Sequence, residues 1–331
     1  MTEATKAIES LIPKVRKQLH QSGLEMLSKC GIQFEFRYLR GMKRKPNAFL
    51  ICGTATDAAV TADLNHKIET GELEREDVLL DLARDRVENH PDKQDIELEE
   101  DDTGSVEDVI SATKDKAVRL VTAHHGRVAP TIQPFATARK FSLNMDRWLR
   151  LRAKQIHEEA EHAENPWHSK VKHQQAAYLN AAARDGFDFV GEQDIVEKSE
   201  TELVIRDTKT SKKSPNAEAA NESNQLSAYA LASQVLDGKL PDKMKLDYLI
   251  DLKKETKTMT LETTRDAEYT QAYLNRLVNG IASIRSGVFV PAPDQAWWCA
   301  QKWCAYYNIC PHVKHQVTTV GSGLVQIASQ G

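Results

Sequence analysis

The chain of 331 residues contains no apolar run long enough to cross a membrane as a helix, and its N-terminus lacks the pattern of a signal peptide. Five cysteines, in a chain with no mark of secretion, do not suggest a disulfide framework. No G-x-x-x-x-G-K-[ST] motif is present, so any ATP-driven motor that works with this protein must be a separate chain. From these absences we expect a cytoplasmic protein with reduced cysteines.

The chain also lacks an excess of positive charge, since its net charge is −4. Its basic residues are nevertheless unevenly distributed. One run is interleaved with Phe36 and Tyr38, and a second lies near Trp148. Such runs could follow a phosphate backbone while aromatic rings stack on bases, although solvated helix faces explain either run alone equally well. The candidate nucleic-acid contacts are Arg37, Arg40, Lys43, Arg44, Arg139, Lys140 and Arg147.

The middle of the chain contains a predicted β-hairpin. Residues 190–197 and 202–209 have the length and β-branched content of two strands, and the polar residues 198–201 join them. We expect an even-numbered loop that pairs Glu197 with Glu202. Because side chains alternate along a strand, this register fixes which residues share a face.

Three ionisable side chains share one face of this hairpin. In the expected register Asp207 lies opposite Glu192, and Asp194 is a diagonal neighbour of Asp207 at roughly 7–8 Å. Lys209 points to the same face. A solvated, charged hairpin is the simpler alternative, but the convergence of two carboxylates and an ammonium favours a site for a hard cation.

Two carboxylates at this separation suit Mg²⁺, which takes one or two carboxylates together with water and phosphate oxygens. The metal would lower the pKa of a bound water and neutralise charge on a phosphodiester, while Lys209 could orient that water. Gln225 and Tyr229 are four residues apart on a predicted helix over 217–236. One face of that helix could present both to the same site.

The three motifs G-x-x-D, D-x-K-T and Q-x-x-x-Y, in this order and spacing, resemble the RecB-like branch of the PD-(D/E)xK nucleases. That branch includes the AddB nuclease domain, CRISPR-associated exonucleases and many phage exonucleases. The resemblance implies an α/β fold with a restriction-endonuclease-like core, in which a central mixed β-sheet is flanked by helices. It also implies a Mg²⁺- or Mn²⁺-dependent deoxyribonuclease, with exonuclease action on single-stranded DNA ends favoured and a helicase or recombinase as a partner.

The resemblance also assigns roles to individual residues. Asp194 and Asp207, with Thr208 beside them, would bind the metal. Lys209 would be the catalytic lysine. Gln225 and Tyr229 would support the catalytic residues. The D-x-K motif alone has no value as a signal, but the three motifs in register are specific.

Four cysteines extend the resemblance to both ends of the chain. Cys299, Cys304 and Cys310 are spaced C-x4-C-x5-C, and Cys30 lies far upstream. In iron–sulfur members of the family one N-terminal and three C-terminal cysteines hold a 4Fe-4S cluster, most often with C-x2-C-x5-C spacing, so the resemblance implies a cluster here. A zinc site would use the same four ligands. Isolated cysteines are usually buried free thiols, as we expect for Cys52.

Two features depart from the family pattern. Relatives carry a glycine followed four residues later by a metal-binding histidine, whereas Gly53 is followed by Asp57. Aspartate is a harder ligand that favours Mg²⁺ or Mn²⁺, so Asp57 could bind the metal, or it could be only a polar helix residue. The strand expected within 132–143 lacks the acidic residue that relatives often have. A catalytically silent DNA-binding or scaffold subunit of a recombination, replication or defence complex is therefore the alternative function.

The remaining segments give a predicted plan of four parts. These are an N-terminal helical region (1–129), a nuclease core (130–265), a C-terminal helix with the cysteine segment (266–314) and a flexible tail (315–331). A helical insertion is expected within the core at about 146–187, where relatives run directly from a strand into G-x-x-D. Helices are also expected over 4–29, 54–90 and 106–123, with His124 and His125 in a loop.

Overall fold

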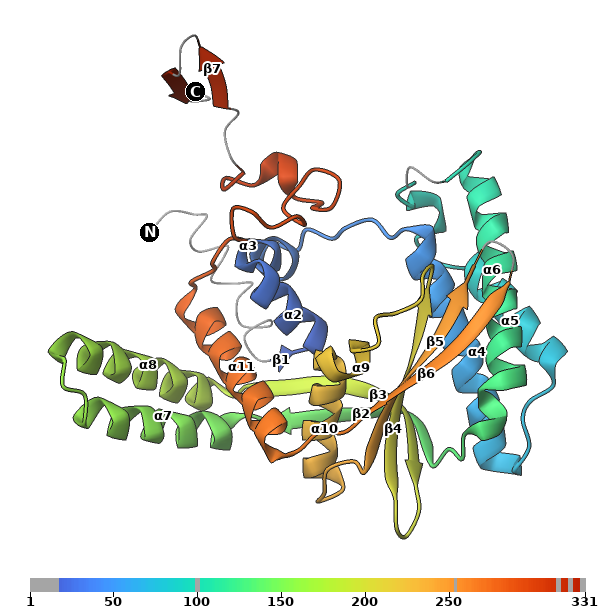
Figure 1. Ribbon diagram of the computed structural model, residues 1–331, viewed down its shortest axis with the longest axis horizontal. Coiled ribbons are helices and arrows are strands. Elements are labelled where there is room, and N and C mark those ends of the chain that lie inside the picture. Colours follow the sequence, from blue (N-terminus) through green and yellow to red (C-terminus); the bar gives the residue numbers. More distant parts are fainter. Residues whose placement is uncertain (1–17, 99–101, 253–254, 314–316, 321–323, 328–331) are drawn as a thin grey trace.

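The computed structural model of the protein describes residues 18–98, 102–252, 255–313, 317–320 and 324–327. A mixed six-stranded sheet crosses the molecule, and helices cover both of its faces (Figure 1). The predicted fold class, a central mixed sheet flanked by helices, is confirmed. The strands of this sheet are β1 (Gln18–Leu19), β2 (Ala136–Asn144), β3 (Asp188–Lys198), β4 (Leu203–Ser211), β5 (Lys243–Asp251) and β6 (Thr256–Thr263).

Alternating residues of the strands contribute to two apolar cores, one on each face of the sheet. Ile195 of β3 and Leu249 of β5 pack in the first core, whereas Val196, the next residue of β3, packs in the second. This follows from the alternation of side chains along a strand. The first core contains α4 (Ala48–Thr70), α5 (Glu76–Glu88) and α6 (Val106–Arg127), and the second contains α2 (Gln21–Lys29), α10 (Asn224–Leu236) and α11 (Ala267–Ser286).

The N-terminal helices differ from the expected ones at their ends. The expected segment 54–90 is two helices, because α4 ends at Gly71 in the left-handed conformation (φ 86°) before α5 begins. Of the helix expected over 4–29, residues 21–29 form α2, but Gln18–Leu19 form the strand β1 instead, and residues 4–17 lie outside the described residues. The prediction of a loop at His124 and His125 is wrong, since α6 continues through both. A glycine and a histidine pair near a helix end resemble a loop locally, but packing of the last turn keeps it helical.

Helices α7 (Asp146–Glu161) and α8 (Pro166–Asp185) form a long hairpin that projects away from the sheet (Figure 1). The hairpin lies between β2 and β3 in the chain, where the helical insertion is expected. The side chain of Asn165 accepts hydrogen bonds from the N–H groups of Trp167 (2.8 Å) and His168 (3.4 Å), so it caps α8, and Pro166 occupies the first helical position. None of the helices in the described residues is long and apolar enough to span a bilayer.

Short elements complete the chain. The expected helix over 217–236 is divided at Ser223, whose hydroxyl accepts the N–H of Leu226 (3.2 Å) and caps α10. Within the segment expected to be a flexible tail, the described residues form the hairpin β7–β8, and the others lie outside the described ranges. The short elements are α3 (Gly31–Phe34), a π-helix (Glu35–Leu39), α9 (Ala219–Glu222), 3-10 turns at Lys93–Asp95, Ala129–Thr131 and Tyr307–Ile309, β7 (Val317–Val320) and β8 (Leu324–Ile327).

Burial of His124 predicts a pH-dependent loss of stability. The side chain is 1% exposed and burial lowers its pKa to about 4, well below the ordinary value of 6.5. The unfolded chain therefore binds a proton as the pH falls through 6.5, while the folded chain does not until about pH 4. We expect the free energy of unfolding to decrease by about 3 kcal/mol as the pH falls from 6.5 to 4. His124→Leu should remove this part of the decrease. Urea unfolding at several pH values measures it, and an unchanged slope in the variant would contradict the assignment.

Candidate active site

The hairpin between β3 and β4 has a register that differs from the predicted one by two residues. Glu197 pairs with Val204 and not with Glu202, because Lys198 pairs with Leu203 and the turn covers residues 199–202 instead of 198–201. The hydroxyl of Ser199 accepts the N–H groups of Thr201 (3.3 Å) and Glu202 (3.0 Å), and the N–H of Ser199 donates to the carbonyl of Glu202 (2.9 Å). This local network fixes the turn over 199–202.

The shift of two residues keeps every side chain on its predicted face but changes its opposite neighbour. Asp207 comes opposite Asp194 instead of Glu192. These two acids lie just beyond Ile195↔Arg206, the last residue pair between β3 and β4. Past that point β4 continues to pair only with β5 among the described strands. The two strands thus separate at the two carboxylates, which leaves room beside them.

Tyr229 and Gln225, on one face of α10, connect the acids to the lysine. The hydroxyl of Tyr229 donates to Asp194 Oδ1 (3.0 Å) and lies 3.4 Å from Asp207 Oδ1. Gln225 Nε2 donates to the same hydroxyl (2.7 Å), and Gln225 Oε1 accepts from Lys209 Nζ (2.7 Å). The structure therefore brings together all five residues predicted to be catalytic.

Thr208 and Lys209 follow the fully buried Asp207 on β4. Lys209 Nζ lies 2.6 Å from Asp207 Oδ2. Burial lowers the pKa of Lys209, but the carboxylates of Asp207 and Asp194 outweigh it and hold the pKa above its ordinary value. Asp207 Oδ2, despite this ion pair, and Thr208 Oγ1 have no hydrogen-bond partner of good geometry among the described residues. A cation beside the two carboxylates would satisfy the Asp207 oxygen.

Asp57 adds a third carboxylate, from α4. Burial raises the pKa of Asp57, and the carboxylates of Asp207 and Glu192 raise it further. Burial and then Asp207 likewise hold the pKa of Asp194 well above its usual range, with a smaller effect of Asp57. Carboxylates from three elements thus repel one another where little water can screen them. A divalent cation bound between them would relieve this repulsion. Within the described residues no three His, Cys, Asp or Glu side chains are already placed to hold a metal ion.

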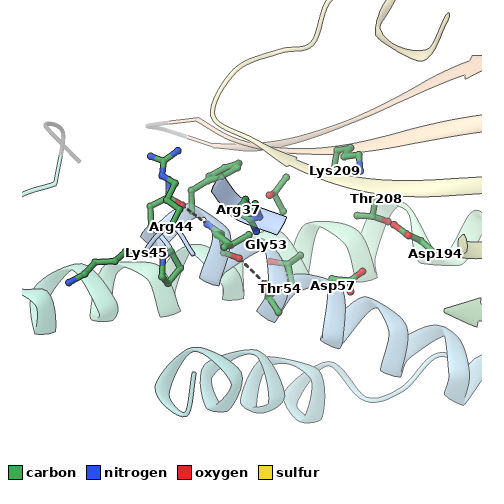
Figure 2. Close-up of a pocket in the computed structure, with 15 residues that line it drawn as sticks. Arg37, Arg44, Lys45, Gly53, Thr54, Asp57, Asp194, Thr208 and Lys209 are labelled. Carbon is green, nitrogen blue, oxygen red and sulfur yellow. Dashed lines mark hydrogen bonds between the residues drawn. The ribbon is translucent and has the colours of Figure 1, made fainter. Parts of the chain in front are cut away.

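A cavity of about 630 Å³ opens beside these residues. Figure 2 shows Asp57 and Asp194 at one end of it and Arg44 and Lys45 at the other. An acidic centre and a basic entrance therefore share one space, which suits a ligand that carries phosphates.

Several residues that line this cavity were not among the predicted site residues. They are Lys45, Pro46, Asn47, Phe49, Leu50, Gly53, Thr54, Thr56 and Thr210. Leu50, Gly53, Thr54 and Asp57 follow the spacing i, i+3, i+4, i+7, which is one face of a helix. Extending this helix face from Asp57 towards the N-terminus would have predicted that Leu50, Gly53 and Thr54 lie at the site.

Comparison with known proteins identifies the family of the chain. The family model of the PD-(D/E)XK nuclease superfamily matches residues 18–311. The chain belongs to this superfamily. Among solved structures, a putative exonuclease from Eubacterium rectale is 11% identical with a TM-score of 0.47, and 96% of each chain is covered. The protein SSO0001 is 14% identical with a TM-score of 0.26, covering 51% of this chain and 82% of its own. No curated protein matches the chain.

Nucleases of this superfamily generally use divalent metal ions, and the residues at the fork between the strands fit one. Asp194 and Asp207 supply two carboxylates, the number that Mg²⁺ commonly takes from a protein. The unpartnered oxygens of Asp207 and Thr208 are hard donors of the kind such ions bind. The carboxylate of Asp57 is close enough to interact with those of Asp207 and Asp194.

The predicted nucleic-acid contacts of the nuclease fall into two groups. Arg37 and Arg44 line the cavity. Arg139 is held in the fold, because its guanidinium forms two hydrogen bonds with the Asp237 carboxylate (3.1 and 2.7 Å). The predicted contacts that do not line the cavity are Arg40, Lys43, Arg139, Lys140 and Arg147.

The four predicted cluster cysteines of the nuclease lie in one region. Cys30 and Cys304 are buried in the same small apolar cluster, and Cys310 packs against it. Burial raises the pKa of the Cys299 thiol, and the other three thiols raise it further. In the described segments, however, these thiols are not placed around a common metal position. Cys52 is separate, on the buried face of α4, where burial raises its pKa to about 11.

The two ends of the cysteine region meet by backbone contact at Gly31. The N–H of Gly31 donates to the carbonyl of Val290 (2.7 Å), and a Cβ on Gly31 would lie 2.7 Å from the nitrogen of Val290. Since backbone cannot yield as a flexible side chain can, Gly31→Ala is expected to lower the free energy of unfolding by about 1–3 kcal/mol.

Gly126→Ala is the matched control for this substitution. Gly126 lies in α6, and a Cβ there would meet nothing within 4 Å. It is expected to stabilise the protein by up to about 1 kcal/mol, since alanine favours a helix. Urea unfolding of both variants measures the difference, and an unchanged stability of Gly31→Ala would contradict the close contact.

Proposed function

We propose that this nuclease is a Mg²⁺- or Mn²⁺-dependent DNA exonuclease of the RecB-like branch, acting on single-stranded ends. One observation carries the proposal. Asp194 and Asp207 meet at the point where β3 and β4 separate, with Lys209 2.6 Å from Asp207, at the end of a cavity whose other end is basic. Buried acids and an amine with this arrangement suit the cleavage of a phosphodiester.

In this proposal Asp194, Asp207 and Thr208 hold the cation, with Asp57 as a further ligand. The bound cation supplies activation of water and neutralisation of phosphodiester charge. Lys209 donates hydrogen bonds towards the reacting phosphate or water, because its ammonium stays beside the Asp207 carboxylate. Tyr229 holds Asp194 in place.

The cavity supports a single strand as the substrate. Its volume of about 630 Å³ is that of a small-ligand site, which suits one or two nucleotides and not a duplex. Arg44 and Lys45 form ion pairs with Glu97 (3.2 Å) and Asp95 (3.3 Å) whose members are all more than 40% exposed. Such pairs contribute little to stability, so these cations can exchange their partners for phosphates.

For the cysteine region we propose a structural 4Fe-4S cluster held by Cys30, Cys299, Cys304 and Cys310. Their gathering in one region from both ends of the chain supports this, and four thiolates are the usual ligand set. Anaerobically purified protein should then show the brown colour of iron–sulfur centres and contain iron and sulfide. Zinc alone, or no metal, would contradict the cluster.

The activity is tested with end-labelled single-stranded, duplex and circular DNA, in Mg²⁺ and in Mn²⁺. The proposal predicts that linear single strands are degraded from their ends, that circular strands persist, and that a chelator stops the reaction. Cleavage of circular DNA would replace exonuclease with endonuclease action. Equal inactivity of the wild type and Asp207→Ala over all substrates and metals would favour the catalytically silent subunit.

A further inference from the structure

Two tryptophans of the cysteine segment lie on the surface with no described role. Trp297 is 68% exposed and Trp303 is 53% exposed, although large aromatic side chains are usually buried. Their ring centroids are 5.6 Å apart and their planes are perpendicular. A perpendicular pair supports itself by an edge-to-face contact while leaving ring surface open. We call Trp297 and Trp303 the tryptophan platform.

The platform is connected to the basic segment that borders the cavity. Tyr306, three residues after Trp303, donates its hydroxyl to the carbonyl of Met42 (2.7 Å). Its ring also packs on Phe36 at 5.3 Å. Met42 is two residues before Arg44, which lines the cavity. The cysteine segment and the entrance of the cavity are thus held together by direct contacts.

Cations accompany these aromatic rings. Lys302 Nζ lies 5.6 Å from the centre of the Trp303 ring, and the guanidinium of Arg40 lies 4.7 Å from the centre of the Phe36 ring. The exposed ring of Trp303, with a positive charge beside it, complements the bases and phosphates of an unpaired strand. A purely apolar protein segment would gain nothing from these cations.

We propose that the tryptophan platform stacks the bases of single-stranded DNA whose end lies in the cavity. This inference rests on the proposed function, because it extends the path of the same strand. It assigns selection of unpaired DNA to a surface outside the catalytic centre, since bases within a duplex have no free face for stacking. Arg37, Arg44 and Lys45 would hold phosphates between the platform and the centre.

Binding is measured without hydrolysis, in an Asp207→Asn background, with a labelled oligodeoxythymidylate longer than roughly 16 nucleotides. Trp297→Ala and Trp303→Ala are each expected to raise Kd roughly 5- to 150-fold, the loss of one base–aromatic stack. Trp167→Ala is the matched control, because Trp167 is 66% exposed at the start of α8 and belongs to no part of the proposed path. Its Kd should equal that of the parent.

An unchanged Kd in the double variant Trp297→Ala/Trp303→Ala would overturn the platform, as would an equal loss in Trp167→Ala. If the double variant does not fold, ultraviolet crosslinking of the unaltered protein to bromouracil-substituted DNA decides. Crosslinks at Trp297 or Trp303 support the proposal, and crosslinks only elsewhere overturn it. Because binding is scored apart from hydrolysis, failure of the platform and failure of the nuclease function give different results.

Discussion

Asp207→Asn is expected to lower the rate of DNA hydrolysis by roughly 10³-fold while leaving the protein folded. The carboxylate is fully buried, and its Oδ2 atom lies 2.6 Å from Lys209 Nζ. Asparagine has the same shape but no charge, so it weakens cation binding and leaves Lys209 without its ion-pair partner. The loss of several kcal/mol of transition-state stabilisation corresponds to this factor. Single-turnover rates at saturating Mn²⁺ measure the effect.

Glu262→Gln provides the control for this substitution. Glu262 lies on β6 of the same sheet, and its side chain is 49% exposed, with Lys245 3.6 Å away. It should alter neither rate nor folding. If Asp207→Asn kept the wild-type rate, the carboxylate would have no part in the reaction.

Arg206→Met is expected to lower the free energy of unfolding by about 3–5 kcal/mol. Arg206 is 3% exposed and donates to both carboxylate oxygens of Asp247 (2.7 and 2.9 Å), itself 1% exposed, and to Glu197 (3.0 Å). Methionine fills much of the same space but leaves Asp247 charged, buried and without its cation. Removing one member of a buried pair costs this much because the other charge stays uncompensated. Guanidinium unfolding measures it.

Two comparisons separate the buried pair from ordinary surface charge. Lys239→Met breaks the exposed pair with Asp242, whose side chains are 43% and 44% exposed, and should cost less than about 1 kcal/mol. Arg206→Met with Asp247→Leu removes both charges and should recover most of the stability. Equal losses in Arg206→Met and Lys239→Met would contradict the buried network.

The identity of the central residues could be predicted because their signal is local. Alternation along two short strands places Asp194, Asp207 and Lys209 on one side, and the spacing of four residues places Gln225 and Tyr229 on one helix face. Neither depends on contacts that are distant in sequence. Fold class followed from the same motifs through their family resemblance.

The register of the hairpin could not be predicted from alternation alone. A turn over 198–201 and a turn over 199–202 keep the same faces, so both registers satisfy the alternation equally. The choice depends on the hydroxyl of Ser199, which accepts two backbone N–H groups and fixes the turn over 199–202. Only then does Asp207 come opposite Asp194, where the strands separate.

The sequence alone also could not show which basic residues line the cavity. Arg139 looked like part of a basic run, but its partner Asp237 lies 98 residues later in the chain. Arg37 and Arg44 belong to a similar run and do line the cavity. Charge composition along the chain cannot distinguish an arginine that binds another part of the fold from one that faces a ligand.

Calorimetric titration of the metal-free protein with Mn²⁺ tests most directly whether Asp194 and Asp207 form a cation centre. The wild type should bind Mn²⁺ saturably, and Asp194→Asn with Asp207→Asn should abolish this binding while the protein remains folded. Undiminished binding in the double variant would contradict a cation held between β3 and β4.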